Sequence, residues 1–162
     1  MITAALLASA GASAKVRSLE MVRFPAGDAA PDGRVNVREV RAYLRRTLDG
    51  TGVDLDDMDL MAAEVVTNAV RHTTSGRPGG RVWVAVITED ARVRVETTDE
   101  GGATTEPMIP PCQVLSGRGL LIVERLSDRW DWSRDGKGRT TVWFELLRGE
   151  ETAITSTAEG NA

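Results

Sequence analysis

The sequence contains very few of the residues that build disulfides and zinc sites. Cys112 is its only cysteine and His72 its only histidine. A single cysteine cannot form an intrachain disulfide, which favours a reducing compartment and predicts a cytoplasmic protein. One cysteine and one histidine also cannot supply the usual ligand set of a structural zinc ion. These absences exclude small domains that are held together by disulfides or by zinc.

The sequence also lacks a broad basic character and long apolar runs. Its net charge is −4, so we expect no direct binding to nucleic acid, where phosphate contacts dominate. No apolar run approaches the roughly 20 residues of a membrane span, so no membrane partner is expected. Residues 1–17 contain a short apolar stretch with small residues, as a secretion signal does. Because no positive charge precedes that stretch, we predict a disordered tail instead.

The remaining composition is that of one soluble globular domain. Apolar residues make up 41% and charged residues 27% of the 162 positions, which is enough to form one core. We predict that this domain spans residues 18–147. Residues 148–162 are polar and small, and they are predicted to form a second disordered tail.

The apolar pattern predicts an ordered series of strands and helices. Helices are predicted within residues 33–48, 56–72 and 119–127, and strands at residues 18–27, 81–88, 92–98 and, as a pair around "DGKG", within 128–147. The second helix is apolar around most of its circumference and should be buried. Polar and apolar residues alternate in "RVRVETT", which predicts a strand with one face exposed to solvent. Few parallel crossovers are implied, so we predict an α+β fold: a two-layer sandwich with helices on one face of a mixed, mostly antiparallel sheet.

Two polar residues stand out on the second helix, in "EVVTNAVRHT". Glu64 and Asn68 are four positions apart, which places their Cβ atoms about 5–6 Å from each other on one face. One interpretation is structural, with Asn68 capping a loop and Glu64 paired with an arginine. The other interpretation is a solvent-accessible pocket that holds a ligand. The spacing alone leaves both interpretations open.

Three further motifs follow along the chain, and each has an ordinary explanation beside a functional one. In "TTDEGG", Asp99 stands at a strand end and Gly101 permits either a tight turn or close approach of a ligand. In "SGRGLLIVERL", Gly117 and Gly119 precede a helix, which forms either a hinge or a phosphate site. The two threonines at positions 140 and 141 begin a strand, where β-propensity is a sufficient explanation.

The order and spacing of these motifs resemble the histidine-kinase-like ATPase domains (the GHKL superfamily) over residues 18–147. "EVVTNAVRHT" is similar to the N box of that family, "DEGG" to its first glycine box, and "GRGLLIVERLSDRW" with "TTVWFEL" to its second box and closing strand. The last stretch resembles small actinobacterial members that are described as anti-sigma-factor serine/threonine kinases. The resemblance implies the family's Bergerat-type ATP-binding fold.

The resemblance also implies roles for individual residues. Glu64 would act as general base near the γ-phosphate, and Asn68 would provide an amide oxygen to Mg²⁺. Asp99 would accept a hydrogen bond from the adenine amino group, and Gly101 would let the base lie close. The other implied ATP-binding residues are Gly117, Arg118, Gly119 and Leu120, in the lid hinge and phosphate cradle, and Thr140 or Thr141, which would reach adenine through a water.

Two departures from the family pattern bear on nucleotide affinity. Gly102 follows Gly101 directly, without a spacer, and the short lid before Gly117 contains three prolines, at positions 107, 110 and 111. Because of these departures, a scaffold domain that no longer binds nucleotide remains an alternative function.

The resemblance implies ATP and Mg²⁺ as cofactors and proteins as partners. The implied function is an anti-sigma factor that holds a sigma factor and phosphorylates a serine of an anti-anti-sigma (STAS-type) protein. An alternative is an ATP-sensing adaptor that regulates by binding alone. Members of the family often pair, which leaves a homodimer open beside a monomer.

Overall fold

The computed structural model describes residues 15–27, 34–109 and 118–149. Along the chain the elements are β1 (Val16–Pro25), α2 (Val37–Leu48), α3 (Leu55–His72), a 3₁₀ turn η1 (Thr74–Gly76), β2 (Arg81–Glu89), β3 (Arg92–Thr98), α4 (Gly119–Leu126), β4 (Arg129–Arg134) and β5 (Thr140–Leu147). The predicted order of strands and helices is confirmed, with η1 added. β1 begins at Val16, slightly before the predicted start of the domain. The greater part of both predicted tails lies outside the described residues.

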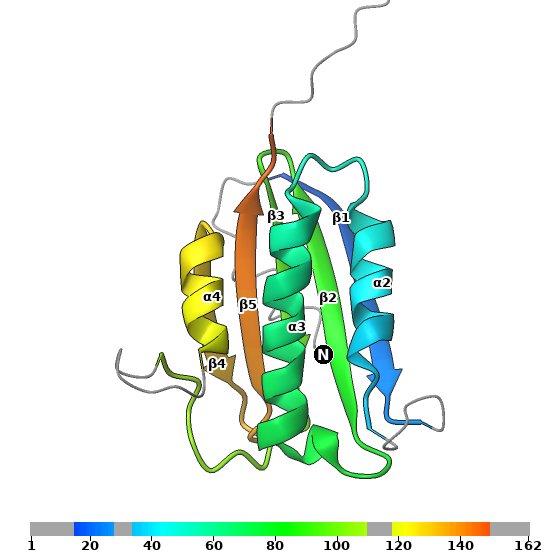
Figure 1. The fold of residues 1–162 in the computed structure, drawn as a ribbon, viewed down its shortest axis with the longest axis vertical. Coiled ribbons are helices and arrows are strands. Elements are labelled where there is room, and N and C mark those ends of the chain that lie inside the picture. The colour runs from blue at the N-terminus through cyan, green and yellow to red at the C-terminus, as the bar shows by residue number, and fades with distance from the viewer. Residues whose placement is uncertain (1–14, 28–33, 110–117, 150–162) are drawn as a thin grey trace, which may run out of the picture.

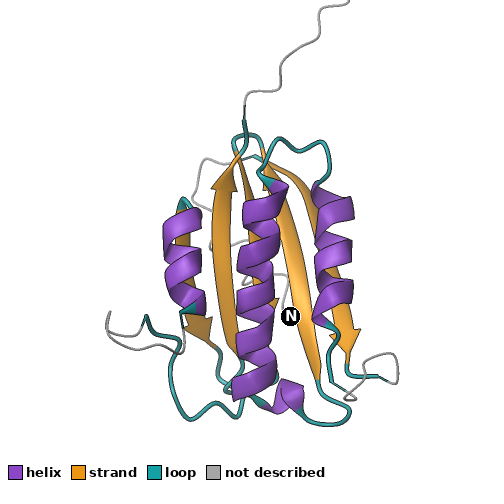
Figure 2. Cartoon of the chain, in the orientation of Figure 1, coloured by secondary structure: helices purple, strands orange, loops and turns teal. Residues whose placement is uncertain are grey.

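The strands form one sheet in the order β1-β2-β3-β5-β4. Every pair of neighbouring strands among the described residues is antiparallel. Figure 1 shows α3 over the middle of the sheet, α2 on the side of β1 and α4 on the side of β4. The helices form one layer and the strands the other (Figure 2), so the predicted two-layer α+β sandwich is confirmed.

The two long helices begin at side-chain caps. The Asn36 side chain accepts a hydrogen bond from the backbone N–H of Arg38, which places the start of α2 at Val37. The Asp54 carboxylate accepts from the N–H groups of Asp56 and Asp57, at 2.9 and 3.0 Å. Because these caps satisfy otherwise free N–H groups, they define where each helix starts.

The core lies between α3 and the inner face of the sheet. Val66 of α3 is fully buried, as are Val82 and Val84 of β2. Each buried side chain of this size contributes about 1.5–3 kcal/mol of transfer free energy. The middle of α3 carries most of its buried apolar face, so polar side chains beside that face, such as Glu64 and Asn68, are informative. In the part of the chain that the structure describes, no helix has the length and apolarity of a membrane span.

The opposite face of β3 differs from the prediction. Alternation in "RVRVETT" predicts a wet face, but Arg94 and Glu96 are only 7% and 6% exposed. The Arg94 guanidinium stacks 3.6 Å from the ring centre of Trp143 and pairs with Glu96 at 2.7 Å and Glu145 at 3.3 Å. Burial raises the pKa of the Glu96 carboxyl. The prediction is wrong because these charged groups satisfy one another and do not need water.

Candidate functional site

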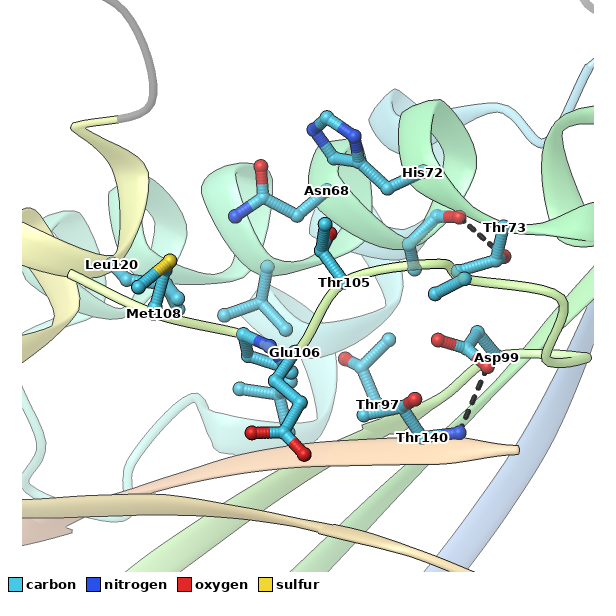
Figure 3. Close-up of a pocket in the computed structure, with 15 residues that line it drawn as sticks. Asn68, His72, Thr73, Thr97, Asp99, Thr105, Glu106, Met108, Leu120 and Thr140 are labelled. Carbon is cyan, nitrogen blue, oxygen red and sulfur yellow. Dashed lines mark hydrogen bonds between the residues drawn. The ribbon is translucent and has the colours of Figure 1, made fainter. Parts of the chain in front are cut away.

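A pocket lies between α3, the start of α4 and the adjoining ends of β3 and β5. The segment 103–109 runs across it, as Figure 3 shows. Its lining combines an apolar floor with a few polar side chains from different elements, which include Asn68, Thr97, Asp99, Glu106 and Thr140. This combination is typical of a small-molecule site.

Glu64 and Asn68 stand side by side on α3, and both are half-buried. Asn68 lines the pocket, and Glu64 lies one turn before it. Within the described residues, neither side chain takes part in a hydrogen bond or an ion pair. The structural interpretation, with a loop cap and an arginine partner, therefore has no support in the described part of the chain. Both polar groups are therefore free to bind a ligand.

Asp99 is fixed at the other end of the pocket. Its side chain is 5% exposed, and Oδ1 accepts hydrogen bonds from the backbone N–H groups of Gly101, at 2.7 Å, and Thr140, at 2.9 Å. Oδ2 has no partner among the described residues and is left to accept from a ligand. Burial raises the pKa of the Asp99 carboxyl, and the two backbone donors oppose that rise. Asp99 thus presents one oriented acceptor to the pocket.

Thr140 and Thr141 are neighbours on β5, so their side chains point to opposite faces of the sheet. The sequence alone does not show which of the two faces the site. Thr140 lies on the helix-facing side of β5, is 4% exposed and lines the pocket. The side chain of Thr141 points to the opposite face, where its Oγ1 atom is 2.8 Å from that of Thr98. The structure therefore places Thr140 at the pocket and Thr141 away from it.

The two consecutive glycines after Asp99 are required by packing within the chain. Gly101 has φ +84°, and a Cβ there would lie 2.6 Å from the carbonyl oxygen of Gly138. Gly102 has φ +81°, and its Cβ would lie 2.8 Å from Cγ2 of Thr74. Gly101 is also fixed by Thr74, whose N–H and Oγ1 donate to its carbonyl oxygen at 2.8 and 3.0 Å. The spacing that departs from the family pattern is therefore compatible with a formed pocket.

The start of α4 lies against Glu64 and Asn68. Gly119 is its first residue, and a Cβ there would lie 2.5 Å from Oε2 of Glu64 and 3.4 Å from Nδ2 of Asn68. Leu120 is 5% exposed and lines the pocket, whereas Arg118, at the cap position, makes no side-chain cap. Gly117, also expected at the site, lies outside the described residues. The uncapped N–H groups of the first helical turn favour an anion near Glu64 and Asn68.

Several lining residues were not found by sequence reasoning. Thr97 lies two positions before Asp99 on the same face of β3, so the strand period could have identified it. Thr105, Glu106 and Met108 also line the pocket, but no periodic signal marks this irregular segment. His72 lies at the exposed end of α3 beside Asn68 in Figure 3.

The donor set suits one kind of metal ion. The described residues contain no group of three or more His, Cys, Asp or Glu side chains that could hold a metal. The free amide oxygen of Asn68, with the Glu64 carboxylate one turn away, provides hard oxygen donors only. Mg²⁺ accepts such a sparse set, because it keeps several waters and takes its other ligands from phosphates. The residues present therefore fit a phosphate-bound Mg²⁺ and do not fit a metal cage made by the protein alone.

Known proteins resemble this chain in sequence. A family model described as "Histidine kinase-like ATPase domain" matches residues 30–146. A protein named anti-sigma F factor from Bacillus cytotoxicus is 33% identical over 127 residues, which cover 71% of this chain and 84% of that protein. A protein of the same name from Geobacillus thermodenitrificans is 29% identical over 133 residues, which cover 75% and 86%. The chain belongs to the histidine kinase-like ATPase domain family.

Proposed function

We propose that the chain binds ATP with Mg²⁺ and acts as an anti-sigma factor with serine/threonine kinase activity toward an anti-anti-sigma protein. One observation carries the proposal: the pocket presents a free carboxylate oxygen of Asp99 and the unpartnered side chain of Asn68, and the unpartnered Glu64 lies one helical turn from Asn68. A nucleotide has matching chemistry, with an amino group on its base and a charged triphosphate at its far end. The name of the curated relatives supports the regulatory part of the proposal.

The adenine end of the proposed complex lies at Asp99 and Thr140. Oδ2 of Asp99 accepts a hydrogen bond from the adenine amino group, while the two backbone donors hold Oδ1 in place. Thr140 borders the same end of the pocket. Guanine has a carbonyl oxygen where adenine has the amino group, so a carboxylate there disfavours guanine.

The phosphate end lies at Glu64, Asn68 and the start of α4. Asn68 would hold Mg²⁺ through its amide oxygen, and the ion would neutralise charge on the phosphate oxygens. The first turn of α4 offers N–H groups to the same phosphates. Glu64 takes the proton from the serine hydroxyl of the partner protein. The serine oxygen then bonds to the γ-phosphorus as the bond from that phosphorus to the β–γ bridging oxygen breaks, which releases ADP.

The proposed partners are proteins: a sigma factor and a STAS-type anti-anti-sigma protein. Arginines on the exposed side of α2 differ in what they contact. Arg41 and Arg45 pair with aspartates of α3, whereas Arg38 and Arg46 have no partner among the described residues. We propose that Arg38 and Arg46 face an acidic or helical surface of such a partner. The protein is proposed to be cytoplasmic, and sedimentation in solution distinguishes a monomer from a homodimer.

Glu64→Gln tests the kinase activity. We expect transfer of labelled γ-phosphate to a candidate anti-anti-sigma protein to fall at least about 100-fold, because a general base contributes about 10²–10⁴ in rate. The affinity for ATP, measured by calorimetry, should stay within about threefold, because a neutral amide keeps the shape of the side chain. Glu39→Gln, at an exposed position of α2, is the matched control and should leave both quantities unchanged.

The other outcomes distinguish the alternative functions. Unchanged transfer in Glu64→Gln shows that Glu64 is not the base. An ATP-sensing adaptor follows if the wild type binds ATP and a sigma factor but transfers phosphate to no anti-anti-sigma protein. A scaffold without nucleotide follows if the wild type binds no ATP in the presence of Mg²⁺.

A further inference from the structure

Arg134, the last residue of β4, connects the wall of the pocket to the segment that crosses it. Its Nε donates to Oγ1 of Thr140 at 3.4 Å, and its Nη2 donates to the carbonyl oxygen of Thr105 at 3.2 Å. The guanidinium also lies 5.8 Å from the ring centre of Trp132. None of the motifs in the sequence includes Arg134. Its contacts hold it next to the proposed adenine end of the site.

The contact with Arg134 restricts the direction of the Thr140 hydroxyl. A guanidinium carries donors only, so the hydroxyl oxygen must act as the acceptor and its hydrogen must point elsewhere. No acceptor for that hydrogen is found among the described residues, and the side chain lines the pocket. The hydroxyl is therefore available to a ligand as a donor.

The neighbouring carboxylate has the opposite polarity. Oδ1 of Asp99 is occupied by two backbone N–H groups, and Oδ2 is left to accept. This end of the pocket therefore presents an acceptor next to a donor. Adenine has the complementary edge, with the amino group as donor and N1 as acceptor. Hypoxanthine and guanine have the reverse, with a carbonyl oxygen at position 6 and a hydrogen on N1.

We infer that Arg134 is a positioning residue that directs the Thr140 hydroxyl toward the base and thereby favours adenine over hypoxanthine and guanine. This inference rests on the proposed nucleotide site. A water between the hydroxyl and the base keeps the same polarity, because a water that accepts from Thr140 has its own hydrogens left to donate to N1. Arg134 acts through Thr140 and does not itself touch the base.

The test compares ATP with inosine triphosphate, which differ only at positions 6 and 1 of the base. Because both carry the same triphosphate, any general attraction between Arg134 and the phosphates cancels in the ratio of their dissociation constants. We expect Arg134→Gln to reduce the preference for ATP by about twofold to tenfold, as expected for one directed hydrogen bond. Arg129→Gln removes the same charge from the first residue of the same strand and should leave the ratio unchanged.

A double-mutant cycle separates positioning from a purely structural role. Thr140→Val removes the hydroxyl and keeps the backbone N–H that supports Asp99, so it should reduce the ratio by a similar factor. Arg134→Gln should then have no further effect on the ratio in the Thr140→Val background. Equal loss of affinity for both nucleotides, or an effect of Arg134→Gln that persists without the hydroxyl, overturns the inference. Failure of the wild type to bind either nucleotide overturns the proposed function, and the inference with it.

Discussion

The backbone of Gly119 packs against the carboxylate of Glu64. A Cβ at position 119 would lie 2.5 Å from Oε2 of Glu64, closer than any normal contact of a Cβ atom. The two residues come from different helices and from different motifs of the sequence. Their contact brings the proposed catalytic carboxylate to the positive end of α4, where the proposal places the phosphates.

Gly119→Ala should therefore impair phosphate transfer more than stability. The new methyl group displaces the Glu64 carboxylate, and we expect transfer to fall at least about tenfold, because a small displacement of a catalytic group is costly. The free energy of unfolding in urea should change by less than about 1 kcal/mol, since alanine favours the helix and the atom that the new methyl group meets most closely is the end of a flexible side chain. Gly136→Ala, which has no atom within 4 Å of its Cβ, is the control. Full transfer activity in Gly119→Ala would contradict the assignment of Glu64.

Asp99→Asn should weaken ATP binding without destabilising the protein. We expect the dissociation constant for ATP to rise about tenfold to a hundredfold, because a charge-assisted hydrogen bond is lost. Burial raises the pKa of Asp99 above its value in the unfolded chain, so the ionised carboxylate opposes folding near neutral pH. The asparagine variant, which keeps an acceptor for the N–H groups of Gly101 and Thr140, should be at least as stable at pH 7.

The pH dependence of ATP binding provides a second measurement on Asp99. Protonation removes the acceptor, so the affinity of the wild type should fall as the pH is lowered through the raised pKa of this carboxyl. The fall should begin at a higher pH than for an ordinary aspartate. Calorimetric titration of Asp99→Asn should show a much weaker dependence over the same range. An equal pH dependence in both proteins would assign the titration to another group.

The sequence predicts the fold well because each element carries a long and consistent pattern. The apolar residues of α3 predict its buried face, although Leu60 is 45% exposed and the helix is not buried all round. The turns that contain glycine and proline mark where the strands begin and end. Glu64 and Asn68 are detectable for the same reason, since these polar groups interrupt the mostly apolar residues 61–70. The general position of the site therefore follows from local sequence. Local sequence does not show whether Glu64 and Asn68 bind a ligand or other groups of the protein.

The remaining features depend on contacts between distant parts of the chain. Alternation in β3 distinguishes polar from apolar positions, but the burial of Arg94 depends on Trp143 and Glu145, about 50 residues further along. Thr140 and Thr141 are chemically identical, so only the register of β5 against β3 decides which one reaches the pocket. Arg134 acquires its position from Thr140 and a carbonyl in an irregular segment, which no local pattern encodes.

Gly101→Ala should be strongly destabilising. Position 101 has φ +84°, and its Cβ would meet the carbonyl oxygen of Gly138 at 2.6 Å, where backbone atoms cannot move aside easily. We expect a loss of about 2–4 kcal/mol in the free energy of unfolding in urea, from backbone strain and the clash together. Gly136→Ala, in the turn between β4 and β5, has a negative or extended φ and open space, and should change stability by less than about 0.5 kcal/mol. Equal stability of the two variants would contradict the packing of Gly101 on this turn.

The buried carboxylate of Asp59 should stabilise the contact between α2 and α3. Asp59 is 5% exposed, and its two oxygens accept hydrogen bonds from Nε and Nη2 of Arg41. We expect Asp59→Asn to lower the free energy of unfolding at pH 7 by about 1–2 kcal/mol, less than for a fully buried pair because Arg41 keeps contact with water. Asp56→Asn, which removes an exposed partner of Arg45, should cost less than about 0.5 kcal/mol.

The effect of pH identifies the ion pair as the cause of this stability. The Arg41 guanidinium holds the pKa of Asp59 below its usual value, so the folded chain favours the ionised form. The contribution of Asp59 is therefore complete above the pKa of an unfolded aspartate and is lost as the pH falls through the lower pKa of the folded chain. Urea unfolding at a series of pH values should show the wild type and Asp59→Asn converging in acid. A constant difference between them would show that shape and packing, rather than charge, account for the role of Asp59.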